Sequence, residues 1–190
     1  KLPGAIPPDN IELPALKSPP VRMDRDRRLL NVLVARGVLS QDEMEAAYEA
    51  AQAQGVDLES LLLDTYHVAK SDFGAALSEY FSCPFLAYDE RAVLEVALLK
   101  NLRIEYLRKS AWIPIKRQGT VVEILRTDPQ DLDKDPDIRR TFPRLTIRVV
   151  VGLRCDLDKW LLLATEQSAR GAITDILGEL VHEVWSEADG

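Results

Sequence analysis

Between residues 24 and 81, apolar side chains recur at intervals of three and four, which is the spacing of one face of an α-helix. They form four groups: Leu29, Leu30, Leu33 and Val34; Met44, Ala47, Tyr48 and Ala51; Leu58, Leu61 and Leu62; and Phe73, Ala76, Leu77 and Tyr80. Each group predicts one short helix, and such helices must pack together to cover their apolar faces. The pattern predicts a small helical bundle over residues 25–82.

The start of the second helix carries local signals of its own. Ser40 followed three residues later by Glu43 is a capping-box pattern, and Leu39 and Met44 occupy the positions of a hydrophobic staple. We therefore expect this helix to begin near Gln41.

The bundle also contains an internal repeat. A shift of 29 residues aligns, without a gap, Leu29 with Leu58, Val32 with Leu61, Leu33 with Leu62, Leu39 with Val68, Met44 with Phe73, Ala47 with Ala76 and Tyr48 with Leu77. This favours a duplicated helix-turn-helix unit. Two amphipathic helices in similar register align in the same way without a common origin.

After residue 82 the pattern becomes that of a mixed α/β segment. Two β-rich runs, 112–117 and 120–125, are separated by a Gln-Gly pair, which is typical of a hairpin turn. Pro114 places the first run at a sheet edge or at the start of its strand, because proline cannot donate to a strand ladder. Around the hairpin we expect a helix over 91–108, a turn and short helix within 127–140, a strand over 145–152 and a helix over 156–166.

The two ends differ from this central part. Six of the 11 prolines lie in the first 20 residues, which predicts an extended leader over residues 1–24. Residues 167–190 keep helical apolar spacing and include Gly171 and Gly178, which weaken a helix. The prediction is thus an α+β fold: a helical subdomain over 25–82, an α/β subdomain with a β-hairpin over 83–166, and a C-terminal helix or linker that packs on its own domain or on a partner.

Composition and charge disfavour several classes of partner and location. A net charge of −7 and a pI near 5.0 disfavour nucleic acid as a partner, because phosphate binding requires a surplus of Lys and Arg. No apolar run approaches the ~20 residues that span a bilayer, and Cys83 and Cys155 are the only cysteines. We expect a soluble, cytoplasmic chain with reduced thiols, and, because it begins at Lys1 rather than Met, an excerpt or processed product.

No constellation of catalytic residues is recognisable. The two histidines, His67 and His182, have no Ser or Cys nucleophile beside them. The acidic run at 128–137 lacks the glycine and closing glutamate of a calcium loop, and none of the nine glycines begins a phosphate-binding loop. The prediction is a non-enzyme with no cofactor and no metal.

Charge is unevenly distributed along the chain. Residues 109–154 carry ten Lys or Arg against six Asp or Glu, whereas residues 155–190 carry two against eight. The basic residues that are candidates for docking a partner are Arg139, Arg140, Arg144 and Arg148. Intramolecular pairing with the acidic tail is the alternative explanation.

The order of these segments resembles one known family. The stretches LLNVLVARGVLSQDEMEAA, LSEYFSCPFL, RKSAWIPIKRQGTVVEILRTDPQDLD and RLTIRVVVGLRCDLDKWL are similar to the N-terminal domain of type II secretion and type IV pilus ATPases, the MshE N-terminal domain, over about residues 26–165. The resemblance implies a regulatory domain of a hexameric motor that docks, in the cytoplasm, onto an inner-membrane platform protein and contacts an ATPase domain.

The resemblance also raises cyclic di-GMP binding, which some members perform through two tandem copies of an R-L-G-x-x-L-x-x-x-G motif. The positions that still match are Arg28, Leu29, Leu33 and Gly37 in the first copy, and Leu58 and Leu62 in the second. In the first copy, a glycine of the motif is replaced by Leu30. In the second copy, the arginine is replaced by Asp57, and the two glycines are replaced by Glu59 and Tyr66. An acid in place of the arginine repels phosphate, so we expect binding to be lost. The alternatives are a dinucleotide sensor with a diverged motif and a stand-alone adaptor of the same fold.

Overall fold

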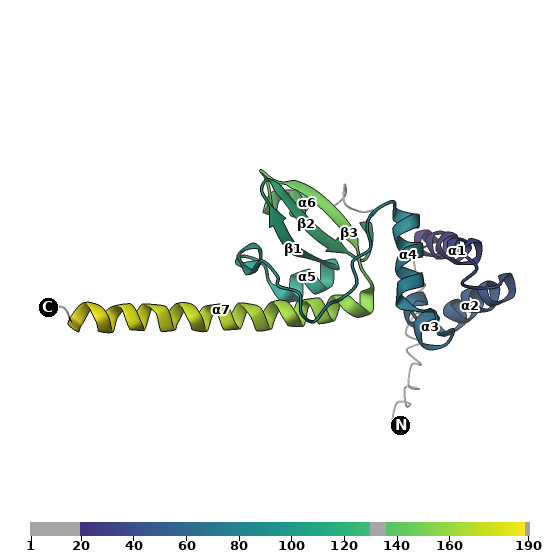
Figure 1. Cartoon of the computed structure of the whole chain (residues 1–190). Coiled ribbons are helices and arrows are strands. Elements are labelled where there is room, and N and C mark those ends of the chain that lie inside the picture. The colour runs from purple at the N-terminus through teal and green to yellow at the C-terminus, as the bar shows by residue number, and fades with distance from the viewer. Residues whose placement is uncertain (1–19, 130–135, 189–190) are drawn as a thin grey trace, which may run out of the picture.

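A computed structural model describes the backbone of residues 20–129 and 136–188, and the side chains in these ranges except at 20–23, 178 and 180–188. The helices are α1 (Pro20–Ala35), α2 (Gln41–Gln54), α3 (Leu58–Asp64), α4 (Lys70–Phe81), the 3₁₀ turn η1 (Val96–Leu99), α5 (Ile104–Ser110), α6 (Pro136–Thr141) and α7 (Arg154–Ala188); the strands are β1 (Trp112–Gln118), β2 (Val121–Arg126) and β3 (Thr146–Val151). Helices α1 to α4 form a bundle at one end, the sheet and its helices follow, and α7 extends away from both (Figure 1). The predicted α+β fold is confirmed.

The bundle shows the predicted repeat in its helix boundaries. Helices α1 and α3 end at Ala35 and Asp64, and α2 and α4 begin at Gln41 and Lys70, so both pairs are 29 residues apart. The capping box that starts α2 is present, with Glu43 N–H donating to Ser40 Oγ and Ser40 N–H to Glu43 Oε2. The aligned apolar positions form one buried core between the two units.

The two copies differ at their turns. The left-handed residue after α1 is Gly37, with φ +72°, whereas the one after α3 is His67, with φ +54°. The left-handed residue of the second copy is therefore His67 and not Tyr66, one position later in a turn of the same length. Ala69 precedes α4 without any side-chain cap, unlike Ser40 before α2.

The sheet has the strand order β1-β2-β3, with β1 and β2 antiparallel and β2 and β3 parallel. The hairpin is confirmed, although its turn consists of residues 119–120, one residue later than predicted. Pro114 lies in the edge strand β1, next to a register shift. The sheet and helices enclose a second core with Trp112 and Trp160 buried in it.

The predicted helix over 91–108 is wrong. Residues 96–99 form a 3₁₀ turn, and only 104–110 are α-helical. Leu94 N–H donates to Gln167 Oε1, and Glu95 N–H donates to the Ile115 carbonyl. Because these amides bond to other elements, the backbone here follows the sheet and α7 instead of closing helical turns.

The predicted ends also need correction. Helix α1 already begins at Pro20, so residues 20–24 are helical and not extended; a proline is well tolerated in the first helical turn. Residues 1–19 and the acidic residues 130–135 lie outside the described part of the chain, and the short helix predicted after them is α6. The helix predicted to end at residue 166 instead continues as a single helix to Ala188.

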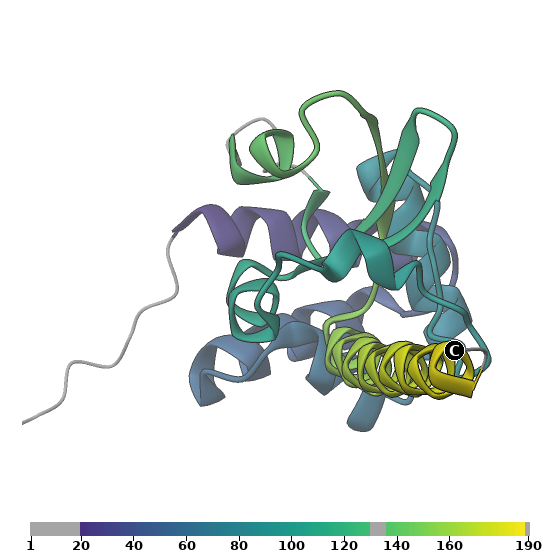
Figure 2. The ribbon, with the colours of Figure 1, turned by 90° about the vertical axis from the view of Figure 1, so that its left-hand side faces the viewer.

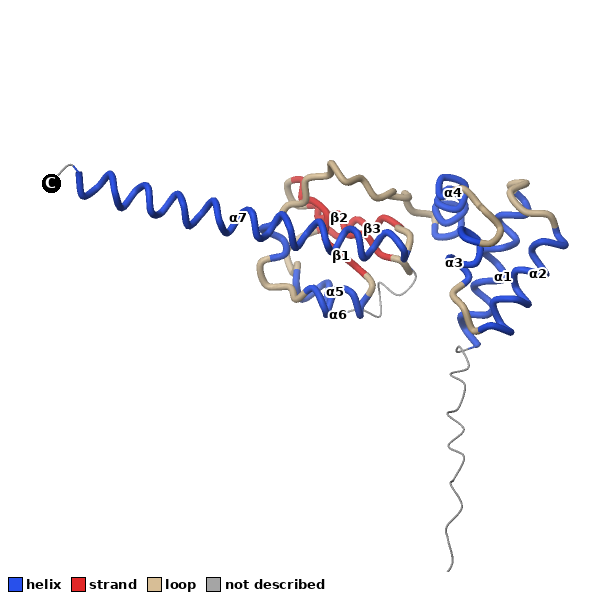
Figure 3. The backbone as a smooth tube through the Cα atoms, turned by 90° about the horizontal axis from the view of Figure 1, so that it is seen from below, coloured by secondary structure: helices blue, strands red, loops and turns tan. Residues whose placement is uncertain are grey.

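Helix α7 is the longest element, with 35 residues. Its first half lies against the sheet, as the view along its axis shows (Figure 2), and its second half projects beyond the other elements (Figure 3). Within the described residues, no helix is both long and apolar enough to cross a membrane.

Candidate functional site

Four of the six residues that match the dinucleotide motif are core residues. Leu29, Leu33, Leu58 and Leu62 are between 0% and 6% exposed and pack between the two helix-turn-helix units. Because these side chains hold the bundle together, their presence is fully explained by packing.

The other two matching residues do not form a ligand cradle. Arg28 is exposed and makes an ion pair of 2.7 Å with Asp24, one helical turn earlier. Gly37 lies in the turn after α1, and a side chain built there would meet no atom within 4 Å. The first copy thus retains a glycine turn and one exposed arginine.

In the second copy, the residues that replace the motif have structural roles. Asp57 is the N-cap of α3, because its carboxylate accepts a hydrogen bond of 3.4 Å from Ser60 N–H. Glu59 reaches a different part of the chain: its two carboxylate oxygens accept hydrogen bonds of 2.9 Å each from the amides of Arg154 and Cys155. These are the first two residues of α7, so Glu59 caps that helix from the bundle.

An ion pair lies beside this cap. Lys70 at the start of α4 donates to Asp156 of α7 over 2.6 Å, and Lys159 lies 3.5 Å from the same carboxylate. Asp156 is only 3% exposed, so its charge needs these partners. The hydrogen bond to Asp156 raises the pKa of Lys70, which keeps that amine protonated. A further pair, Arg25 with Asp128, joins α1 to the segment after β2.

The backbone also connects the bundle to the sheet, both covalently and through hydrogen bonds. Residues 84–86 run alongside β3, with Leu86 N–H donating to the Val151 carbonyl over 2.9 Å and Val151 N–H to the Pro84 carbonyl over 2.8 Å. Phe85 packs directly on Gly74 of α4, where a Cβ atom would approach its ring within 2.2 Å. We call Glu59, Lys70, Gly74, Phe85 and Asp156 the joint, because together they fasten the bundle to α7 and β3.

Ionisation in the joint follows from burial and from neighbouring charge. Burial raises the pKa of Glu59, and the hydrogen bonds from the two amides of α7 offset this only in part. Cys155 is exposed as a residue, but its thiol is partly shielded and faces Glu59 and Asp156, which raises its pKa to about 11. Burial also raises the pKa of the Cys83 thiol. Both cysteines are free thiols.

The four arginines proposed for docking are all on the surface. Arg139 and Arg140 lie in the last turn of α6, Arg144 follows that helix, and Arg148 lies in β3. Arg140 is 3.7 Å from Asp137, and Arg148 is 3.9 Å from Glu123. Both distances are long, and the side chains of Arg140 and Arg148 are more than half exposed, so their charged heads are accessible to a partner.

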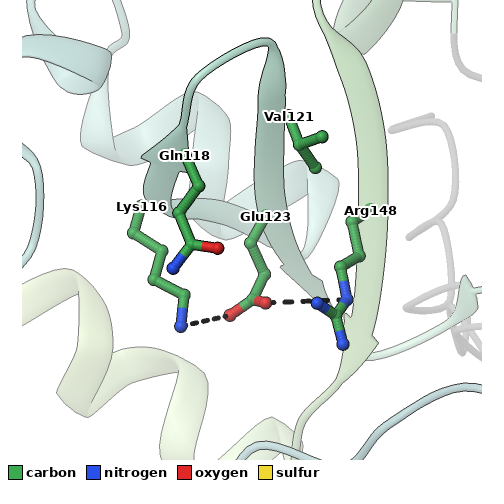
Figure 4. Close-up of a pocket in the computed structure, with 5 residues that line it drawn as sticks. All are labelled: Lys116, Gln118, Val121, Glu123 and Arg148. Carbon is green, nitrogen blue, oxygen red and sulfur yellow. Dashed lines mark ion pairs between the residues drawn. The ribbon is translucent and has the colours of Figure 1, made fainter.

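Arg148 is the outer member of a row of charges across the sheet. Lys116 of β1 and Arg148 of β3 both point toward Glu123 of β2, which lies between them (Figure 4). The hollow lined by this row, Gln118 and Val121 has a volume of about 10 Å³, roughly enough for one water molecule. It is too small to hold a dinucleotide.

The structure places the tail away from the basic residues. Helix α7 leaves the sheet on the side opposite to the bundle, and its second half does not return toward α6 (Figures 1 and 3). Within the described part of the chain, no group of three or more His, Cys, Asp or Glu side chains is arranged to hold a metal ion. His67 is an exposed turn residue, and the side chain of His182 lies outside the described residues.

The fold and joint therefore define a two-part α+β module whose long helix is fastened to a helical repeat. Residues 81–171 match the family model of the MshEN domain. This match confirms the resemblance to the MshE N-terminal domain family that the sequence indicates. The match begins at Phe81, so the dinucleotide-motif positions at residues 28–62 lie before it.

One solved structure shows the same fold. A structure of MshE with cdg matches with a TM-score of 0.57 and 23% identity, covering 70% of this chain and 96% of that one. The N-terminal domain of XpsE matches with a TM-score of 0.48 and 20% identity, covering 72% of this chain and 92% of that one. No curated protein matches the chain in sequence.

Proposed function

We propose that this chain is a non-catalytic docking domain of a bacterial type II secretion or type IV pilus motor ATPase. In this proposal it lies in the cytoplasm and ties the motor to the cytoplasmic part of an inner-membrane platform protein. The MshEN match supports the motor context. The joint supports the docking role indirectly, because Glu59 and Lys70 fix the bundle on α7 and so hold the surface of the module in one arrangement for a partner.

A cyclic di-GMP sensor is the second candidate, and it is favoured by the similarity to MshE, whose structure was solved with cdg. The residues of this chain argue against it. Asp57 and Glu59 stand at an arginine and a glycine of the binding motif, and both carboxylates are already engaged with backbone amides. Two acids near a phosphate would repel it. A stand-alone adaptor of the same fold is the third candidate. It is excluded if the native gene continues into a phosphate-binding loop and supported if it does not.

Docking is tested by measuring the affinity of this chain for the purified cytoplasmic domain of the platform protein from the same genome. The Arg139→Glu/Arg140→Glu/Arg144→Glu variant reverses three exposed charges, and Arg91→Glu/Arg103→Glu is the matched control at exposed arginines elsewhere. The arginines are docking residues if the first variant weakens binding by at least tenfold while the control does not. Equal affinities of all three proteins would exclude these arginines from the interface, and absence of binding by the wild-type chain would overturn the docking function.

A further inference from the structure

Helix α7 has two different apolar faces. In its first half, Leu157, Trp160 and Ala164 are at most 4% exposed and pack into the core of the sheet. The second set of apolar residues is exposed: Leu162 60%, Ile173 57%, Ile176 57% and Leu177 56%. We call these four residues the outer stripe.

The outer stripe lies on the side of the helix that faces away from the sheet. At roughly 100° per residue, Ile173 is about 180° around the helix from Ala164 but only about 20° from Leu162. The stripe therefore begins beside the sheet, at Leu162, and continues along the projecting half. The sequence keeps the same spacing at Leu180 and Val184.

This geometry excludes the sheet of the same chain as the cover for the stripe. Gln167 is the last residue of α7 with a hydrogen bond from its side chain to another described element, through Ala92 and Leu94. Beyond it, Gly171 and Gly178 lower the intrinsic stability of the helix, and in proteins most helical stability comes from packing of an apolar face. Burial of the stripe against a partner would stabilise this half.

Charge indicates the kind of partner. In the projecting half, Glu179 is exposed and lies about 60° around the helix from Ile176, whereas Asp175 lies on the face opposite to the stripe. The sequence places Glu183 and Glu187 at the same offset from Leu180 and Val184, and Arg170 is the single Lys or Arg of this half. Pairing with the same helix of a second copy would place these acids near one another, which is unfavourable. A groove with Lys or Arg along its margins complements both the apolar stripe and the acids beside it.

We propose that the outer stripe docks as a helix into an apolar groove with basic margins on the partner of this domain. This inference rests on the proposed docking function and assigns it a second surface, separate from the arginines of α6 and β3. The binding mode is that of an amphipathic helix in a groove, with Ile173, Ile176 and Leu177 as the anchors of the projecting half and Leu162 three turns before Ile173.

The test uses the full chain and the purified cytoplasmic domain of the platform protein. The variant Ile173→Ser/Ile176→Ser/Leu177→Ser removes three anchors from a part of α7 that contributes nothing to the core. The control Thr174→Ser/Asp175→Glu keeps the charge and changes two exposed residues outside the stripe, with Asp175 about 160° around the helix from Ile173 and Leu177. Affinities are measured by calorimetry at 50 and 300 mM salt, with circular dichroism to verify the fold and light scattering to measure mass.

The proposal predicts at least tenfold weaker binding by the stripe variant, unchanged binding by the control, and weaker wild-type binding at the higher salt concentration. Equal affinities of wild type and stripe variant would overturn the proposal and leave docking through the arginines intact. A wild-type dimer that becomes a monomer in the stripe variant would show that a second copy covers the stripe. No binding by the wild-type chain would overturn both this inference and the docking function.

Discussion

Glu59 links two segments that are 95 positions apart, so its removal tests the joint directly. The substitution Glu59→Ala deletes both acceptors for the first amides of α7. Loss of a capping side chain costs about 1–2 kcal/mol, and loss of a negative charge at a helix N-terminus costs about 0.3–1 kcal/mol. Arg154 and Cys155 are exposed, so water can solvate the freed amides and hold the total near the lower part of this range.

Urea unfolding followed by far-ultraviolet circular dichroism measures this effect. With a slope of about 2 kcal/mol per M for a small protein, a loss of about 1–2 kcal/mol lowers the midpoint by about 0.5–1 M. Glu59→Gln keeps one acceptor oxygen and loses the charge, so its midpoint should lie between those of wild type and Glu59→Ala. Glu49→Ala removes an exposed acid on α2 and is the matched control. A Glu59→Ala midpoint equal to that of the control would refute the view that this carboxylate fastens the bundle to α7.

Three further predictions concern the repeat and the joint. Ala69→Ser supplies the cap that α4 lacks, and should raise the free energy of unfolding by about 1 kcal/mol in urea titrations; no gain would show that the turn geometry at residue 69 prevents capping. Gly74→Ala forces the Phe85 ring out of its contact, and should destabilise the protein by about 1–3 kcal/mol and increase hydrogen exchange in β3, whereas a neutral effect would mean that residues 84–86 move freely. The pKa of Cys155 is raised from 9.0 to about 11, so its thiolate fraction at pH 8 is about a hundredfold below that of an ordinary thiol. Its labelling by a disulfide reagent should therefore be slower by about this factor. Labelling at the ordinary rate would contradict the shielding by Glu59 and Asp156.

Sequence reasoning succeeded where the signals are local. The capping box at Ser40 and the hairpin depend on contacts between neighbours in sequence, and the repeat of 29 residues is visible in the order of the apolar residues; all three are present. The prediction failed over residues 91–108, because the amides of Leu94 and Glu95 bond to α7 and β1, which no local pattern reports. The predicted end of α7 at residue 166 is also too early. The buried apolar residues lie on one side of this helix up to Ala164, and apolar residues lie on the other side from Ile173 onward, so the sequence pattern indicates two helices where there is one.

The joint was missed for a related reason. Glu59 was noticed only as a departure from a glycine of the dinucleotide motif, although the structure gives it a partner in α7. One signal was available: α7 begins after Leu153, which has no side-chain acceptor to cap a helix. A long helix without a local cap indicates that its first amides are satisfied from elsewhere in the chain.

The central proposal is that this chain docks a partner and does not sense a nucleotide. A calorimetric titration with cyclic di-GMP, at moderate salt and with ligand in large excess, tests it most directly. The account predicts a flat trace, because Asp57 and Glu59 occupy the motif with negative charge and are bonded within the protein. Saturable heat at one ligand per chain, lost in an Arg28→Ala variant, would contradict the account and identify the domain as a sensor.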